Sequence, residues 1–413
     1  MPDAIVRCGE PKKTVPPRLG RRRVAARRAQ TGPPPSAGAV LDSARSSPGS
    51  LMQIHLVLPG LIWPGASHTS PASGLELPAL ARLLGVGQRR VGDFEPLDRQ
   101  LARALGLALP SGEEDPLPLA VLRRLGETEP CVDAGGEWLC ADPVNLSFAH
   151  EHLLLNDFPA DELADDEVAA LVEALNASFG DLGRFEACTS TRWYLRLAER
   201  TRAKLFPLHD VVGRPIRHFL PEGEDARLWQ RTMNEVQILL HNHPVNQARE
   251  AAGRRPANSL WFWGAGTLEP GSVSPPHAVQ SVEPLARGIA RAGDLEATAP
   301  DPASALQQDT VVVLDALLKP ARQLDLEVWR SGLATLERDW FAPLAAALRD
   351  GRLQTLTLTA PGDRNTLELE VRAAARWKFW RKPIAFETLL QSLAPPLPAA
   401  PREPNAVPAR PAR

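Results

Sequence analysis

Four arginines lie in segments that look folded, and their side chains could bind an anionic group. Arg192 and Arg196 flank an aromatic pair in TRWYLRL, and Arg249 and Arg254 lie in NQAREAAGRR. A guanidinium group offers paired N–H donors that match phosphate and carboxylate oxygens. The chain holds only six lysines, which leaves 41 arginines, so the alternative is that these side chains only keep the surface soluble. We predict Arg192, Arg196 and Arg249 as ligand-binding residues.

One acid stands where α/β proteins place their site residues. In DTVVVLDAL, four apolar residues, three of them β-branched, are followed by Asp315. The carboxyl end of a core strand is where an open α/β sheet builds its ligand site. We therefore predict Asp315 as the catalytic acid, if there is one.

Other polar and aromatic residues allow two interpretations each. His241 and His243 could both reach a metal across a helix end, or they could cap the helix, since two residues apart they do not share a helix face. Trp261 and Trp263 are expected in the core and a pocket wall, because no groove with interleaved basic residues suggests stacking on nucleic-acid bases. Asn258 can satisfy backbone groups.

Several classes of protein are excluded by what the sequence lacks. It has no P-loop, no Rossmann G-x-G-x-x-G and no G-x-S-x-G motif. Its four cysteines show no C-x-x-C spacing, which excludes a thiolate zinc ribbon and a disulfide scaffold, and Cys131 and Cys140 are expected to be small buried residues. No apolar stretch reaches the ~18–20 residues of a membrane span. We expect a cytoplasmic protein without a membrane partner.

Hydrophobic patterns predict the elements that would position these residues. Apolar or alternating runs predict strands over 53–59, 184–197 (two short strands), 258–266, 309–317 and 354–361. The segment 137–149 is expected to be a strand running into a turn at Asp142-Pro143, and 75–109 to be short helices with loops. Because a helix separates the last two strands, they should be parallel, which predicts an α/β fold.

Three amphipathic helices are predicted by 3.6-residue spacing. The first, over 160–180, should be capped by Asp161 or Asp165. The second, from Glu222 to His241, should be ended by Pro244, and the third covers 325–351. The residues expected on their apolar faces are Val168, Leu171, Val172 and Leu175; Leu228, Met233, Val236, Leu239 and Leu240; and Val328, Leu333, Leu336, Phe341, Leu344 and Leu348.

The segment HPVNQAREAAGRRPANSLWFWGAG, residues 243–266, resembles the archaeal-type cofactor-independent phosphoglycerate mutases of the alkaline-phosphatase-like superfamily. The resemblance adds His243, Asn246, Arg249, Asn258, Trp261 and Trp263 to the predicted ligand-binding residues. It implies a mixed sheet flanked by helices, with an inserted α+β subdomain at about 140–250. Over residues 52–393, including DPVNLSF, GRPIRHFLPEG and KFWRKP, the chain also resembles bacterial RpfE-type regulatory proteins.

Metal-dependent members of this family hold two divalent ions with Asp and His clusters, and both ions act in phosphoryl transfer. In this chain all nine histidines precede residue 278, and Pro361-Gly362-Asp363-Arg364 stands where the family has Gly-Asp-His. Arginine cannot ligate a metal. We therefore expect no cofactor; the alternative is Mn, Mg or Zn held by residues not aligned with the family, namely Asp133, Asp142, His150, His152, Asp315, Asp325 and Asp363.

The two ends of the chain differ from its middle. Residues 1–51 carry ten basic and three acidic residues, a net charge of +7, and 394–413 hold seven prolines without periodicity. We expect both to be disordered, with 1–51 read as a nucleic-acid arm, a transit peptide or sequence ahead of a true start at Met52. The total charge of -2 then leaves -9 for the remainder, so we do not expect its fold to bind nucleic acid.

Together these observations predict a phosphoglycerate mutase-like protein in which the two-metal site is lost. Its expected role is to bind a phosphorylated small molecule, or to act on an unknown regulatory protein partner as a pseudoenzyme. The alternative is an active metal-dependent mutase or phosphohydrolase that interconverts 3- and 2-phosphoglycerate.

Overall fold

The structure is a computed structural model of the chain, and it describes residues 52–65, 69–110, 112, 116–127, 136–149, 152–374 and 380–394. The predicted extension 1–51 and, apart from Ala394, the predicted tail 394–413 lie outside these residues, as does Cys131. Among the described residues, no helix combines the length and apolar character needed to cross a membrane.

A six-stranded mixed sheet forms the first half of the fold. Its strand order is β10 (Ala278–Gln280), β11 (Thr310–Val313), β1 (Gln53–Val57), β12 (Thr355–Pro361), β13 (Asn365–Arg372) and β2 (Gln88–Asp93). The first four strands are parallel, β13 runs antiparallel to them, and β2 pairs antiparallel with β13. All four residues of β11 are buried, as expected for a strand covered on both faces. This confirms the predicted α/β class, with β11 and β12 parallel on either side of β1.

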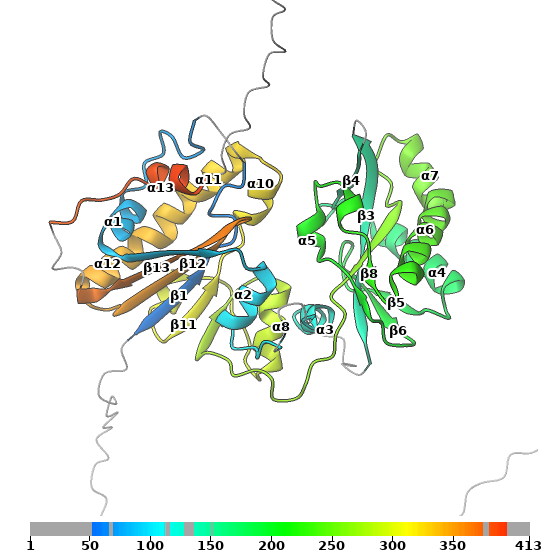
Figure 1. Cartoon of the computed structure of the whole chain (residues 1–413), viewed down its shortest axis with the longest axis horizontal. Coiled ribbons are helices and arrows are strands. Elements are labelled where there is room, and N and C mark those ends of the chain that lie inside the picture. Colours follow the sequence, from blue (N-terminus) through cyan, green and yellow to red (C-terminus); the bar gives the residue numbers. More distant parts are fainter. Residues whose placement is uncertain are drawn as a thin grey trace, which may run out of the picture. The chain divides into compact units, whose positions relative to one another are not determined.

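Helices cover this sheet, and one of them is capped by a carboxylate from far along the chain. Figure 1 shows α1 (Pro78–Val86), α11 (Leu326–Leu336), α12 (Ala342–Asp350) and α13 (Phe386–Leu393) gathered on one face. A π-helical turn, Glu337–Phe341, joins α11 to α12. There the side chain of Glu337 accepts hydrogen bonds from the backbone N–H groups of Ala79 at 2.6 Å and Leu80 at 3.1 Å. The carboxylate satisfies free donors at the start of α1 and complements the helix dipole.

The second sheet is antiparallel. It contains β4 (His152–Asn156), β3 (Trp138–Ala149), β6 (Trp193–Leu197) and β5 (Gly183–Ala187) in that order, and β9 (Ser259–Trp263) also pairs with β3. Figure 1 shows α4 (Asp165–Ser178), α6 (Ala226–Asn242) and α7 (Pro244–Ala251) beside it. A short ribbon pairs β7 (Ala203–Lys204) with β8 (Glu222–Gly223). This sheet with its helices is the α+β part of the fold, and β9 extends it beyond the predicted bound of about 250.

The remaining helices are short and join the larger elements. They are α2 (Leu97–Ala104), α3 (Leu119–Leu125), α5 (Leu208–Val211), α8 (Pro284–Ala292), α9 (Pro302–Ala305) and α10 (Leu318–Arg322), with a 3₁₀ turn at Ile216–His218. Helices α3 and α8 pack very closely at two glycines. A Cβ atom on Gly126 would lie 1.7 Å from the carbonyl oxygen of Pro284, and one on Gly288 would lie 1.6 Å from that of Leu122.

Several local predictions are wrong, each for a physical reason. No turn interrupts β3 at Asp142-Pro143, because β9 pairs with both residues. Neither Asp161 nor Asp165 caps α4; instead Glu167 accepts from the backbone N–H of Ala164 at 3.0 Å. Pro244 does not merely end a helix, since it is the first residue of α7, a position where a backbone N–H would have no acceptor within the helix.

One residue on each of two predicted helix faces is misplaced, whereas the others are buried or, for Leu239, half-buried, and one strand was not predicted. Leu228 is 54% exposed and Val328 53% exposed, whereas the neighbouring Trp229 and Trp329 are buried. The larger aromatic side chain takes the core position in each helix. Strand β2 was expected to be helix or loop, and its residues are mostly exposed, so it carries no apolar pattern.

Candidate functional site

A cavity of about 330 Å³, here called the central pocket, lies at the carboxyl end of β11. This volume is near the lower end of the range for small-molecule sites. Residues that lie in or next to each of the two sheets line this cavity. The charged and titratable residues among them are Asp98, Arg123, Asp157, Arg192, His209, Glu283, Asp315, Lys319 and Arg322.

Residues that follow strands of the mixed sheet line one side of the pocket. Asp315 follows β11 by two residues, and the chain then forms α10, which carries Lys319 and Arg322. Glu283 is the N-cap residue of α8, where its side chain accepts from the backbone N–H of Ala286 at 2.6 Å. The pocket thus lies where the α/β rule places a site, with acids and cations side by side.

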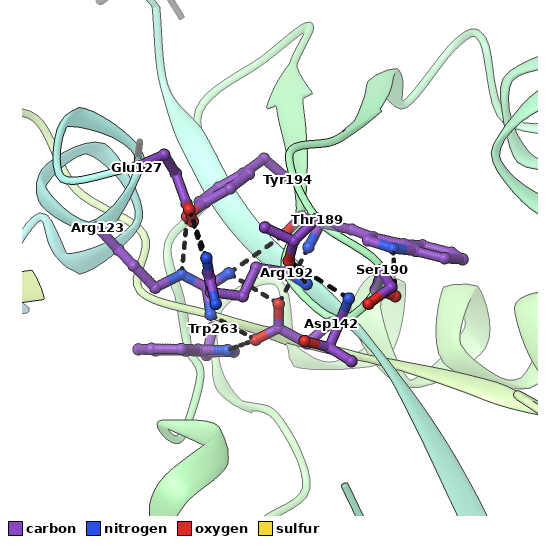
Figure 2. A network of polar contacts seen from close by, with 10 residues as sticks. Arg123, Glu127, Asp142, Thr189, Ser190, Arg192, Tyr194 and Trp263 are labelled. Carbon is purple, nitrogen blue, oxygen red and sulfur yellow. Dashed lines mark hydrogen bonds and ion pairs between the residues drawn. The ribbon is translucent and has the colours of Figure 1, made fainter. Parts of the chain in front are cut away.

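A buried ion pair forms the floor on the other side. Arg123 on α3 donates from Nη1 and Nη2 to the two carboxylate oxygens of Asp142 on β3, each at 2.7 Å, and from Nε to the hydroxyl of Tyr194 at 3.0 Å (Figure 2). The indole Nε1 of Trp263 donates to Asp142 at 2.9 Å, and its ring stacks near the guanidinium, 4.9 Å from it. All three nitrogens of Arg123 are therefore engaged. This pairing raises the pKa of Arg123 against the effect of burial, so the floor is a rigid, charge-neutral unit.

A second ion pair adjoins the first, and it uses two of the three nitrogen donors of its arginine. Arg192 donates from Nε and Nη2 to the two oxygens of Glu127, at 2.8 and 2.7 Å, and Tyr194 donates its hydroxyl to Glu127 at 2.6 Å. Figure 2 shows Glu127 and Arg123 reaching Tyr194 from the same side. Although burial opposes ionisation, hydrogen bonds from Arg192 and Tyr194 lower the pKa of Glu127. Arg192 lines the central pocket with 32% of its side chain exposed.

Arg322 differs from the other arginines of the pocket because it has no partner. Within the described part of the chain, it makes no hydrogen bond and no ion pair within 4.0 Å. Burial lowers the pKa of Arg322, and the more distant carboxylates of Asp210 and Asp363 offset only part of this effect. The group stays a cation at neutral pH. A desolvated cation without a counterion is unfavourable, and a bound anion would relieve that cost.

Three titratable groups of the pocket have raised pKa values. Burial raises the pKa of Glu283 to about 7, and the charges of Asp315 and Asp98 add to the effect. Burial also raises the pKa of Asp315. For His209, burial acts to lower the pKa, but the carboxylate of Asp98, 3.2 Å from Nε2, outweighs it and the pKa is raised. Proton uptake in the pocket can therefore occur near neutral pH.

Several residues predicted from the sequence lie outside the pocket lining and hold backbone in place. The side chain of Asn246 donates to the carbonyls of Leu240 and Ala257 and accepts from the N–H of Ala257. Asn258 bonds both backbone groups of Leu146, at 2.8 and 3.0 Å. Arg249 is fully buried, donating to the carbonyl of Arg255 at 2.7 Å and, at 2.6 Å, to the same Glu167 that caps α4.

The other predicted residues divide between the core, the surface and the pocket. His243 accepts from the N–H of Val245 and so caps α7, and Trp261 is buried with its Nε1 donating to the carbonyl of Phe206. Arg196 is exposed on β6. The structure brings Arg192, Trp263 and Asp315 together around the central pocket, where Trp263 serves as a wall.

Sequence reasoning missed Lys319, Arg322 and Glu283. No motif marks them, and arginine is common throughout the chain. The sequence could have indicated Lys319 and Arg322 as site residues, because α10, which carries both, directly follows Asp315 at the end of β11. The N-cap position of Glu283, just before Pro284, was a second signal.

Comparison with known proteins links part of the chain to one enzyme family. Residues 141–246 match the family described as 2,3-bisphosphoglycerate-independent phosphoglycerate mutase. A phosphoglycerate mutase of this name from Methanothermobacter thermautotrophicus is 37% identical over 132 residues, 30% of this chain and 32% of the relative. Another, from Methanothrix thermoacetophila, is 34% identical over 113 residues, 27% of this chain and 29% of the relative. The matches thus span less than a third of these relatives.

Among solved structures, a cofactor-independent phosphoglycerate mutase from Thermoplasma acidophilum aligns over 84% of this chain and all of its own, with a TM-score of 0.41 and 17% identity. The match to the phosphoglycerate mutase family lies in the segment that supplies most of the second sheet.

The curated relatives and the matched family overturn our expectation that the protein needs no cofactor, because that family depends on a divalent metal such as Mn²⁺ or Mg²⁺. Among the described residues, however, no three His, Cys, Asp or Glu side chains gather as a metal site would require. Around Asp315 the pocket offers Lys319 and Arg322, which repel a metal ion. Asp133 and His150, two of the alternative ligands, lie outside the described residues. The described residues do not fit a two-metal centre.

Proposed function

We propose that the protein is a phosphoglycerate mutase-like binding protein whose central pocket takes a small phosphorylated carboxylate. The observation that carries the proposal is the unpaired, partly desolvated guanidinium of Arg322 in a pocket at the carboxyl end of a parallel strand. Lys319 on the same helix adds a second cation; its ion pair with Asp157 is long, at 3.3 Å, and half exposed. A phosphate group can accept several such charge-assisted hydrogen bonds at once.

The outcome of binding, in this proposal, is regulation. The resemblance to RpfE-type regulatory proteins supports it, as does a pocket floor in which Arg123 is saturated by Asp142 and Tyr194. Such a floor can hold a ligand in place. Its arginine, however, has no free N–H donor with which to stabilise negative charge that develops during a reaction. The ligand-bound form would act on a partner protein in the cytoplasm.

An active mutase is the second candidate, and the names of the partial relatives favour it. The two functions share a ligand class and differ in turnover. Conversion of 3-phosphoglycerate to 2-phosphoglycerate by the full chain, assayed with Mn²⁺, Mg²⁺ or Zn²⁺, decides between them. Metal-dependent turnover would replace the regulatory function with the mutase.

The binding proposal has its own test, which is isothermal titration of the full chain with 3-phosphoglycerate. We expect saturable binding that weakens at least about tenfold, or about 1.4 kcal/mol, in Arg322→Met. Arg184→Met is the matched control, because Arg184 is exposed on β5 and outside the pocket lining. Absence of binding, or equal weakening in both variants, would refute the proposal.

A further inference from the structure

The charged groups of the central pocket can be sorted by the partners that they already have. Six of the nine are already in ion pairs with side chains: Arg123 with Asp142, Arg192 with Glu127, Lys319 with Asp157 and His209 with Asp98. Glu283 accepts from a backbone N–H at the start of α8. Two groups remain, Arg322 and Asp315. In the described part of the chain, neither side chain bonds to a polar group of another residue.

The two unpaired groups lie in the same cavity without reaching each other. Both line the central pocket, and no ion pair within 4.0 Å joins them. Asp315 is half-buried, so its carboxylate has lost part of its hydration, as has the guanidinium of Arg322. Each charge is costly alone. A ligand that carries both signs of charge would satisfy the two groups together.

A plain anion would satisfy only one of them. A phosphate bound at Arg322 adds negative charge near Asp315 and near Asp98, Asp157 and Glu283, the other acids of the lining. This repulsion opposes the attraction that Arg322 supplies. An ammonium group on the same ligand would donate a charge-assisted hydrogen bond to Asp315 and so offset part of this repulsion.

We propose that the preferred ligand of the central pocket is a zwitterion, a phosphorylated amino acid whose anionic end binds Arg322 and whose ammonium group donates to Asp315. The inference rests on the proposed anion-binding function and narrows its ligand class. Asp315 becomes the residue that determines specificity, since a carboxylate without a partner distinguishes an ammonium from a hydroxyl group. The pocket's size suits a ligand of a few carbon atoms.

The decisive comparison uses ligands that differ at one substituent. O-phosphoserine and 3-phosphoglycerate share the carbon chain, the phosphate and the carboxylate, and differ by an ammonium in place of a hydroxyl. Isothermal titration of the full chain with both enantiomers of O-phosphoserine and with 3-phosphoglycerate is expected to show about tenfold or tighter binding of one enantiomer over 3-phosphoglycerate. In Asp315→Asn this preference should vanish while 3-phosphoglycerate still binds. Asp166→Asn, the same change on an exposed position of α4, should keep it.

Each failure has a distinct signature. Binding of 3-phosphoglycerate at least as tight as that of both enantiomers, or an unchanged preference in Asp315→Asn, overturns the zwitterion inference alone. No binding of any of the three ligands overturns the anion-binding function and the inference with it.

Discussion

At the scale of residues, the central pocket is distinguished by two charged side chains that the fold leaves without partners. Burial of a charged side chain is normally accompanied by a counterion, as for Arg123 with Asp142 at 2.7 Å. Arg322 departs from this rule, and so does Asp315 in the same pocket. Unfavourable side chains that persist in a fold are typical of binding sites, where the ligand supplies the missing partner.

Removing the charge of Arg322 should stabilise the free protein. Methionine keeps much of the side-chain volume without a charge to desolvate, so we expect Arg322→Met to raise the free energy of unfolding by about 1 kcal/mol. Urea denaturation without ligand measures this. The exposed control Arg184→Met should stay within about 0.5 kcal/mol of wild type. A loss of stability in Arg322→Met would mean that Arg322 has a structural role.

Glu283 should make stability depend on pH. Its pKa is about 7 in the fold, raised by burial from an ordinary value of 4.5. The folded state therefore holds a proton that the unfolded state loses, and stability falls as pH rises from about 5 to 7. Glu283→Gln keeps an acceptor for α8 and removes the titration. Over this pH range the free energy of unfolding of Glu283→Gln should fall less than that of wild type, by about 1–3 kcal/mol. If the free energies of unfolding of wild type and Glu283→Gln fall equally over this pH range, Glu283 is not the titrating group.

At the scale of elements, the pocket depends on how α3 and α8 meet. Helix α3 carries Arg123, and Glu283 precedes α8. A side chain on Gly288 would collide with the carbonyl of Leu122, at 1.6 Å, and neither side is flexible. The two helices can therefore approach this closely only because both Gly126 and Gly288 lack a Cβ atom.

Gly288→Ala should therefore separate the helices and weaken both the fold and the site. We expect a loss of about 3 kcal/mol or more in the free energy of unfolding, the range of severe overpacking, together with weaker ligand binding. Gly92→Ala on β2 is the control, because its new Cβ meets nothing closer than 4.0 Å. Chemical denaturation of the two variants tests the difference, and equal stability would show that α3 and α8 can shift apart freely.

The strand β3 holds the acid on which the pocket floor depends. Replacing Asp142 by Asn keeps the shape but leaves Arg123 buried without a counterion. We expect a loss of about 3–5 kcal/mol in the free energy of unfolding. The pair Arg231–Glu235 on the surface of α6 gives the contrast, with 79% and 45% of the two side chains exposed, and Glu235→Gln should cost less than about 0.5 kcal/mol. If both substitutions cost the same, the floor is not the rigid unit described above.

At the scale of the whole molecule, the strands and helices could be predicted from the sequence better than the residues of the central pocket. Runs such as residues 310–313 and 259–263 are apolar for most of their length, and both are buried strands. The exposure of Leu228 and Val328 could not be predicted from spacing alone, because a tryptophan next to a leucine or valine can take the core position instead. The pocket was harder still, since Arg322 and Asp315 meet groups from distant segments, such as His209 and Trp263, only after folding. Residues of the most recognisable motif, Asn246 and Arg249, instead fix backbone in α6 and in the loop that precedes β9.

The most direct test of the central claim is the crystal structure of the full chain grown with 3-phosphoglycerate or O-phosphoserine. The account predicts one ligand in the central pocket, with an anionic oxygen at a hydrogen-bond distance of about 2.7–3.0 Å from the guanidinium of Arg322. A ligand bound through other arginines, with Arg322 still unpaired and the central pocket empty, would contradict it.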